Sequence, residues 1–301
     1  EFWIAFPPND VVELARGHII EIYVTSRVNT TVTLEAPGTG DIFKKDVKAF
    51  EITTFSSEEN TTRLSWEVRK GETAQSKGVR LTSPDPISVY AMDGKRYSSD
   101  GYLAIPVANF GKKYLHNAYY DYFLSGRGHE LGAGFVIVAS EDNTNVTMKL
   151  RGEGKGMAET YQGGHDIGDV LHTTLDEGET YMVRGDGKTR GMFDLSGSSI
   201  ESDKPVGVFS FHMRTDIPSW DVRPGRDHII EMVPPVSVWG KKAYSVEFKR
   251  ETDKGDFFRI MCAEPNTKIE AAWYDKSTRK LIKRIGPLTL KNEGDFYQYW
   301  N

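Results

Sequence analysis

A strand pattern with a period of two occurs three times along this chain. Apolar and polar residues alternate through residues 31–36 (TVTLEA), 145–150 (NVTMKL) and 268–273 (KIEAAW). Such alternation places one set of side chains inward and the other outward, which is typical of a half-buried strand. Before each stretch come a turn ending in asparagine and a short apolar run, at residues 22–24, 136–138 and 260–262. We therefore expect three similar hairpins, in which the first strand is covered on both faces.

The similarity extends beyond these hairpins. Residues 83–90 (SPDPISVY) match residues 202–209 (SDKPVGVF), so that Pro205 follows Pro86 by 119 positions. Residues 100–107 (DGYLAIPV) match residues 227–234 (DHIIEMVP). Steps of this length indicate repeated domains rather than the shorter units of solenoid proteins.

Two shorter sequences recur with the same spacing. An aromatic residue followed by Gly-Lys-Lys occurs at residues 110–113 and again at 239–242. A glycine followed by an acidic residue occurs late in each predicted unit, at Gly71-Glu72, Gly178-Glu179 and Gly294-Asp295. These sequences predict equivalent turns in each repeat.

The predicted fold is all-β, with tandem or pseudo-symmetric antiparallel β-sandwiches built from a repeat of roughly 120 residues. We expect a partial first unit over residues 1–77, a complete sandwich over 78–200 and a third unit over 201–301 without its closing strands. The third unit is completed either by the first or by a neighbouring chain. Residues 1–8 (EFWIAFPP) have an apolar strand pattern that could supply a missing edge, and helix should be confined to short turns.

Bulk properties narrow the range of partners. The 38 basic and 43 acidic residues give a net charge of −5 without charge blocks, which argues against nucleic acid as the main partner. The single cysteine, Cys262, forms no internal disulfide and is expected to be a small buried hydrophobe. No apolar run approaches the roughly 18 residues that cross a bilayer. Because the chain begins at Glu1 rather than Met, we expect it to be a piece of a longer protein.

Three motifs carry a family resemblance, at residues 1–7 (EFWIAFP), at 87–91 leading to 100–106, and at 227–241. In this order they resemble the N-terminal domain of IgGFc-binding proteins. The resemblance implies an extracellular setting, in mucus-type proteins or in large surface and adhesion proteins, and no known catalytic residues. Nothing in the sequence marks an antibody site, so antibody is not carried over as a partner.

The sequence shows no catalytic or metal-binding signature. The seven histidines are scattered, with no HExxH pair and no Cys-His cluster, so neither a metal nor a cofactor is expected. There is no GxSxG motif for a serine nucleophile. Asp227-His228 suggests acid-base chemistry, but its repeat counterpart is Asp100-Gly101, which favours a structural aspartate. We expect no enzyme, although paired carboxylates for glycoside hydrolysis can be recognised only in space.

The loop over residues 212–227 is the candidate ligand site. Its counterpart, residues 92–100, is shorter, so this loop is an elaboration on a shared scaffold. It contains residue types that are enriched in binding hot spots, and a tryptophan can also stack on a sugar ring. The predicted ligand contacts are Arg214, Trp220, Arg223 and Arg226. In the alternative interpretation, Trp220 folds back as a lid on its own sandwich.

Three sequons, at Asn29, Asn60 and Asn145, satisfy the rule for N-glycosylation in a secreted animal protein. In a bacterial protein they would be ordinary exposed polar residues. The prediction for the whole chain is a non-enzymatic module of an extracellular or cell-surface glycoprotein, which recognises a glycan or protein ligand in adhesion. Flanking domains would be its other partners, and the segment would not insert into a membrane. The alternatives are a structural spacer and a carbohydrate-active enzyme.

Overall fold

The computed structural model describes residues 1–10, 19–59, 66–95, 97–124, 129–154, 159–188, 193–219, 225–246, 255–275 and 277–300. The chain divides into two compact units, Glu1–Lys242 and Ala243–Asn301. The described part is all-β, as predicted, and its helix is confined to 3₁₀ turns at Ser57–Glu59, Val107–Asn109 and Val236–Val238. None of the helices in these ranges is long and apolar enough to cross a membrane.

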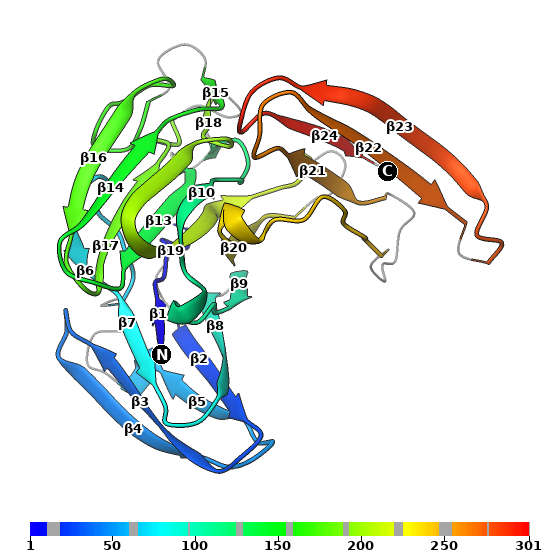
Figure 1. The fold of residues 1–301 in the computed structure, drawn as a ribbon. Coiled ribbons are helices and arrows are strands. Elements are labelled where there is room, and N and C mark those ends of the chain that lie inside the picture. The colour runs from blue at the N-terminus through cyan, green and yellow to red at the C-terminus, as the bar shows by residue number, and fades with distance from the viewer. Residues whose placement is uncertain are drawn as a thin grey trace. The chain divides into compact units, whose positions relative to one another are not determined.

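One motif of four strands occurs three times among the described residues, and in the second copy the short β15 lies between its second and third strands (Figure 1). In each copy the first strand pairs with the fourth and the second pairs with the third. The first copy comprises β2 (Ile19–Ser26), β3 (Thr30–Ala36), β4 (Asp41–Val47) and β5 (Thr53–Ser56). The second comprises β13 (Ala133–Ala139), β14 (Thr144–Lys149), β16 (Val170–Leu175) and β17 (Glu179–Arg184). The third comprises β21 (Phe257–Met261), β22 (Thr267–Tyr274), β23 (Leu281–Leu290) and β24 (Phe296–Trp300).

This pairing corrects the predicted hairpins. The strand-turn-strand sequence does occur three times, but its two strands do not pair with each other. β2 and β3 lie in different sheets, and β13 and β14 pair with different parts of β19. The turn therefore carries the chain from one sheet to the other. An alternating pattern is the same in both arrangements, because it depends on which face is buried and not on the neighbouring strand.

A closing segment completes the first two copies. In the first copy it is β7 (Val79–Thr82), which pairs with β3, followed by β8 (Ile87–Lys95), which pairs with β2. In the second copy it is the single long strand β19 (Ser199–Thr215), which pairs with β14 near its start and with β13 from Val206 onward. Pro86 and Pro205 lie between the two pairing regions, which explains their match in the sequence.

Edge strands complete two sandwiches on the same plan. In the first, the sheets have the orders β1-β7-β3-β4 and β5-β2-β8-β9. In the second, β10 and β14 flank the start of β19, while β13 and β20 flank its end. The edge strands are β1 (Phe2–Ile4), β9 (Ser98–Leu103), β10 (Gly111–Leu115) and β20 (Asp227–Met232). Residues 1–8 thus supply an edge strand, as their pattern predicted. The remaining short strands are β6 (Gln75–Ser76), β11 (Tyr122–Leu124), β12 (His129–Leu131), β15 (Glu153–Gly154) and β18 (Phe193–Asp194).

The pairing links residues on both sides of the predicted unit boundaries. β7 begins after residue 77 but pairs with β1 and β3, and β19 continues through residue 200 to pair with β13. The division at residues 77 and 200 stays a prediction. Apart from β6, which pairs with β17, the pairing groups the main described strands of residues 2–103 and of residues 111–232 as the two sandwiches.

The core follows the alternation of the strands. Phe135 and Ile137 of β13 lie in the core of the second sandwich, whereas Val136 and Val138 lie in a core shared with the first. β13 is therefore covered on both faces, as predicted. The corresponding prediction for β2 is wrong, because Tyr23 is only half-buried and donates a hydrogen bond to Glu21. β2 covers a core on one face only.

Candidate binding cleft

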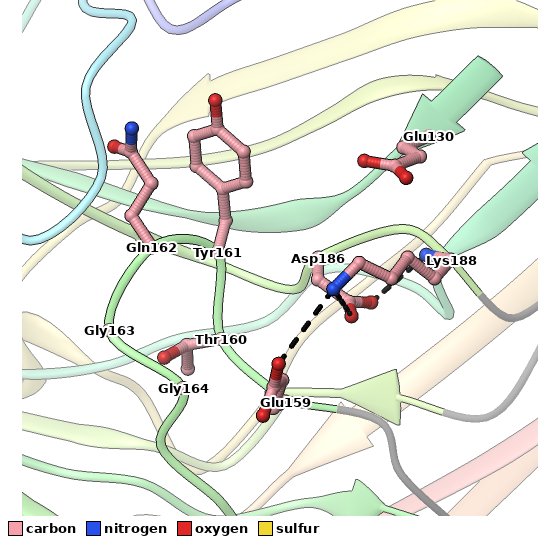
Figure 2. A pocket seen from close by; sticks show the side chains of 9 residues that line it. All are labelled: Glu130, Glu159, Thr160, Tyr161, Gln162, Gly163, Gly164, Asp186 and Lys188. Atoms are coloured by element: carbon pink, nitrogen blue, oxygen red, sulfur yellow. Dashed lines mark hydrogen bonds and ion pairs between the residues drawn. The ribbon is translucent and has the colours of Figure 1, made fainter.

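A cleft of about 290 Å³ lies at one end of the second sandwich (Figure 2). β13 begins at this end, and β17 ends here, because Gly134 lies opposite Arg184. The pairing of β13 with β19 also ends here, where Ala133 lies opposite His212. The cleft is lined by two loops and by one residue of β12. These residues are Glu130, Glu159, Thr160, Tyr161, Gln162, Gly163, Gly164, Asp186 and Lys188.

Three of the four charged side chains that line the cleft are acidic. Nζ of Lys188 lies 3.1 Å from Oδ2 of Asp186 and 3.7 Å from Oε1 of Glu159, so it ties the two loops together. Glu130 adds a third carboxylate to the lining. Among the described residues, no group of three or more His, Cys, Asp or Glu side chains is placed to hold a metal ion. Carboxylates and amide oxygens accept hydrogen bonds, so the cleft suits a ligand that presents donors.

The loop over residues 159–165 is anchored at several points. The Gly71 N–H donates to Oε1 of Gln162 at 2.7 Å, and Nε2 of His165 lies 3.2 Å from Oε2 of Glu72. The Tyr161 N–H donates to the Arg184 carbonyl at 2.8 Å. These contacts hold the loop against β17 and against residues 71–72, which lie between β5 and β7 of the first sandwich.

Buried Arg184 forms part of the floor beneath the loop. Its guanidinium lies 3.5 Å from the centre of the Tyr161 ring, and Nη1 donates to the Gly185 carbonyl at 2.8 Å. Burial lowers the pKa of Arg184, while Tyr161, Asp121 and other nearby groups act in the opposite direction. The charge is thus retained inside the protein, where it fixes the orientation of Tyr161 by a cation–π contact.

Asp121 lies behind the cleft and is 2 % exposed. Its carboxyl oxygens accept hydrogen bonds from the N–H groups of Ala133 at 2.8 Å and Gly187 at 3.0 Å. Burial raises the pKa of Asp121 to about 7, against the effect of these two bonds and of Arg184. A Cβ on Gly185 would lie 2.1 Å from Oδ2 of Asp121, so this close approach requires glycine.

His212 is held neutral at the same end. Its Nε2 donates to the Tyr120 carbonyl at 2.8 Å, and its Nδ1 accepts the Arg214 N–H at 3.1 Å. Burial lowers the pKa of His212 to about 3. His228 is buried next to it, and its Nδ1 donates to the His212 carbonyl at 2.9 Å. The two histidines therefore connect β19, β20 and the segment that contains Tyr120 by hydrogen bonds.

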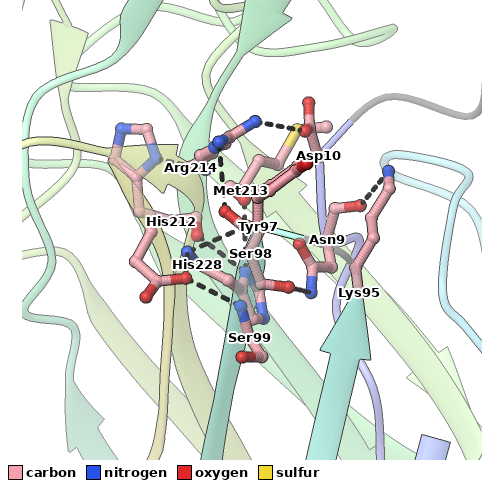
Figure 3. Close-up of polar contacts among 11 residues, drawn as sticks. Asn9, Asp10, Lys95, Tyr97, Ser98, Ser99, His212, Met213, Arg214 and His228 are labelled. Atoms are coloured by element: carbon pink, nitrogen blue, oxygen red, sulfur yellow. Dashed lines mark hydrogen bonds and ion pairs between the residues drawn. The ribbon is translucent and has the colours of Figure 1, made fainter. Parts of the chain in front are cut away.

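Arg214, one of the predicted ligand contacts, has partners within the protein (Figure 3). Its Nη1 lies 2.9 Å from Oδ2 of Asp10, and Nη2 donates to the Tyr97 carbonyl at 3.0 Å. The Asp10 N–H in turn donates to the Met213 carbonyl. Arg214 thus connects the end of β19 to the N-terminal segment and to the turn between β8 and β9.

Of the other three predicted ligand contacts, the described residues include only Arg226. Arg226 is half-buried just before β20, while Trp220 and Arg223 lie outside the described residues. The loop that carries them joins β19 to β20 at the same end of the second sandwich as the cleft. Its remaining described part is anchored, because the Tyr119 hydroxyl donates to the Pro218 carbonyl at 2.9 Å. The role of this loop in binding stays a prediction.

The sequons differ in their surroundings. Asn29 and Asn145 are exposed, and Asn60 lies outside the described residues. Nδ2 of Asn145 donates to Oδ2 of Asp203 at 2.7 Å, and its Oδ1 accepts from the Thr174 hydroxyl. Asn29 uses its Oδ1 to accept the Ala49 N–H at 2.8 Å.

Sequence reasoning missed the cleft residues. Glu130 comes from β12, and Tyr161 and Asp186 come from two separate loops. No periodicity or motif connects them, because strand pairing alone brings them together. The unequal loop lengths pointed to the end of the sandwich at which this cleft lies, and not to its residues.

Comparison with known proteins identifies the family. Residues 100–301 match the family described as IgGFc binding protein. The chain belongs to this family. A human protein named IgGFc-binding protein is 27% identical over 163 residues, which cover 54% of this chain and 3% of the human protein. The chain thus spans a small part of that relative's length, and no solved structure matches it. The family resemblance inferred from the sequence is confirmed.

Proposed function

We propose that this chain is a non-catalytic binding module of an extracellular protein, with its ligand site at the loop end of the second sandwich. The observation that carries this proposal is membership of the IgGFc binding protein family over residues 100–301. That range contains most of the second sandwich, including its cleft and the loop over residues 212–227. The name of the human relative, IgGFc-binding protein, describes a binding protein, and this supports a binding role here.

The ligand is a glycan or a protein that presents hydrogen-bond donors. Glu130 and Glu159 offer carboxylate oxygens in the cleft, and Lys188 offsets part of the negative charge. Hydroxyl groups of a glycan or basic side chains of a protein would meet these acceptors. Trp220 and Arg223 would extend the contact from the adjacent loop.

A carbohydrate-active enzyme is less well supported. Glycoside hydrolysis requires a protonated carboxylic acid that reaches the scissile bond, together with a second, ionised carboxylate. At this end, the carboxyl whose pKa is raised belongs to Asp121, which is 2 % exposed and accepts two backbone hydrogen bonds. The carboxyl groups of Glu159 and Asp186 both form ion pairs with Lys188. This arrangement favours binding over cleavage.

An array of glycans and extracellular proteins, probed with the intact chain, tests the proposal. We expect saturable binding to one ligand class and at least tenfold weaker binding by Glu159→Gln, with Glu51→Gln on the first sandwich as the matched control. If the chain binds neither a glycan nor a protein on the array, the result would support the spacer alternative. Release of products from a polysaccharide panel would support the enzyme alternative.

A further inference from the structure

Three large apolar side chains are exposed at one end of the first sandwich. Val28 lies in the turn between β2 and β3, and Phe50 and Ile52 lie in the turn between β4 and β5. Their exposed fractions are 47%, 79% and 71%. Two hydrogen bonds of 2.8 Å join the turns, because the Phe50 N–H donates to the last carbonyl of β2 and the Ala49 N–H donates to Oδ1 of Asn29. Val28, Phe50 and Ile52 therefore form one apolar tip.

The corresponding turns of the other two copies contain no valine, isoleucine or aromatic residue. In the first copy the turns have the sequences RVN (27–29) and KAFEI (48–52). In the second copy they are SEDN (140–143) and DEG (176–178), and in the third AEPN (263–266) and KNEGD (291–295). The four-strand motif thus forms without an apolar tip, and the tip is specific to the first copy.

Phe50 occupies a backbone position that glycine holds in the other copies. Its φ of 64° lies in the left-handed region, as do those of Gly178 and Gly294, at 75° and 79°. The N–H groups of these glycines donate to the carbonyls of Ala139 and Cys262, which end the first strand of each motif or follow it directly. A bulky residue is strained in this region, and a ring in water gains no packing energy in return. Such strain points to a function outside the sandwich core.

Asn29 differs from the equivalent turn asparagines, because it belongs to a sequon. Asn29 is followed by the residues TT, whereas Asn143 is followed by TN and Asn266 by TK. N-glycosylation requires serine or threonine at the second position after the asparagine. The copy with a sequon in its turn is therefore the copy with an apolar tip.

The side-chain amide of Asn29 is oriented for a glycan. Asn29 is exposed, its Oδ1 accepts the Ala49 N–H, and its Nδ2 makes no hydrogen bond with any described residue. A glycan replaces one hydrogen on Nδ2 and leaves Oδ1 unchanged, so the bond to Ala49 is kept. In the sequon of the second sandwich, by contrast, Nδ2 of Asn145 donates to Oδ2 of Asp203.

We propose that Asn29 carries an N-linked glycan whose first sugars cover the apolar tip. In the attachment, C1 of the sugar leaves a diphosphate oxygen of a lipid-linked oligosaccharide and bonds to Nδ2, which loses one proton; the lipid diphosphate departs. The C–H faces of the sugars pack on Val28, Phe50 and Ile52, which removes apolar surface from water. The proposal requires a secretory pathway that attaches N-glycans, and it is independent of the ligand site on the second sandwich.

Hydroxyl-radical footprinting of the intact chain, secreted from animal cells, tests this proposal. Mass spectrometry of glycopeptides first gives the occupancy of Asn29. Because a bulky glycan shields the ring, Phe50 should be oxidised at least threefold more slowly in the glycosylated chain than in Thr31→Ala, which has lost the sequon. Thr31→Ser keeps the sequon and the hydroxyl that donates to Asp46, so it should oxidise as slowly as the original chain. Tyr97, which is 72% exposed in the turn between β8 and β9, should react equally in all three chains.

Two outcomes of this footprinting would overturn the proposal. One is an unmodified Asn29 in the secreted chain. The other is equal oxidation of Phe50 in the glycosylated chain and in Thr31→Ala, because the glycan would then be attached without covering the tip.

Thermal unfolding gives a second measurement. The glycan should raise the Tm difference between the original chain and Thr31→Ala by about 2 °C or more, relative to the same two chains made in bacteria without glycosylation. Phe50→Gly should remove most of this gain. Ile42→Ala, at an exposed residue near the other end of β4, should keep it and is the matched control. A gain that is as large in Phe50→Gly as in Ile42→Ala would overturn the proposed packing.

Discussion

Asp100 and Asp227 occupy equivalent positions in the two sandwiches, and each accepts a hydrogen bond from the strand that carries the other. Oδ2 of Asp100 accepts the Ile230 N–H at 3.0 Å, and Oδ1 of Asp227 accepts the Ser99 N–H at 2.7 Å. Each aspartate also accepts a hydrogen bond from the residue that follows it. The Gly101 N–H donates to Asp100 at 2.9 Å, and the His228 N–H donates to Asp227 at 3.0 Å. The two strands β9 and β20 therefore meet with approximate two-fold symmetry, and the aspartates have the structural role predicted from the repeat.

Replacing either aspartate with alanine should weaken the contact between the sandwiches. Each substitution removes hydrogen bonds to two backbone N–H groups, one of them on the other strand, and this loss costs about 1 kcal/mol. Urea unfolding should show a lower midpoint for Asp100→Ala and for Asp227→Ala, with little change for Glu51→Ala at an exposed site. Equal stability of all three variants would argue against the symmetric contact.

Asn143 should tolerate glycine but not valine. Its φ of 53° lies in the left-handed region, which asparagine and glycine adopt readily and β-branched residues do not. Asn143→Val should therefore cost about 1–2 kcal/mol of unfolding free energy, while Asn143→Gly should cost much less. Thermal or urea unfolding of the two variants provides the comparison. A valine variant as stable as the glycine variant would contradict this account of the turn.

The stability of the chain should depend on the protonation of Asp121. Its pKa is raised to about 7, so its stabilising contribution is complete below the unfolded value of 3.8 and is lost as the pH rises toward 7. His212, whose pKa is lowered to about 3, acts oppositely, since its contribution is lost as the pH falls from 6.5. In a comparison with Asp121→Asn the His212 contribution cancels. The variant should gain up to about 4 kcal/mol relative to the original chain between pH 4 and pH 7. Parallel stability curves would contradict the raised pKa.

Arg214→Ala should destabilise the chain. The substitution leaves Asp10, which is 2 % exposed, without its guanidinium partner. Loss of one member of a buried ion pair is costly, so we expect a decrease of about 2 kcal/mol or more. Lys44→Ala on the exposed face of β4 is the control for loss of one positive charge. A variant with the stability of this control would show that Arg214 is free for ligand contact.

Much of the architecture could be predicted from the sequence. The match between residues 83–90 and 202–209 identified β7–β8 and β19 as equivalent, because both must bend at a proline between two sheets. The alternation identified which residues of β3 and β14 face the core. Strand partners could not be predicted, because a period of two is the same for a hairpin and for strands in opposite sheets.

Two turns show a finer limit of pattern matching. Asn29 does not adopt the positive φ of Asn143 and Asn266, because residues 27–29 connect β2 to β3 whereas residues 140–143 connect β13 to β14. The one-residue difference in the length of the connection changes the turn.

The predicted match of Gly71-Glu72 with Gly178-Glu179 is also wrong. Phe50 takes that role, with a φ of 64° and its N–H donating to the Ser26 carbonyl at 2.8 Å.

The candidate site was predicted only as a location. The unequal loop lengths indicated the end of β19, and the structure places the cleft at that same end. The cleft residues themselves depend on the approach of two loops and β12, which are distant in the sequence. Arg214 was selected by residue type, and its contact with buried Asp10 depends on the packing of the N-terminal segment.

Equilibrium titration of the double variant Trp220→Ala/Arg223→Ala with the array-selected ligand tests the central claim most directly. Our account predicts at least tenfold weaker binding with an unchanged thermal unfolding midpoint, because these residues would contact the ligand rather than support the sandwich. Full affinity would contradict a ligand site at this end. A large fall in the midpoint would instead show that Trp220 covers its own sandwich as a lid.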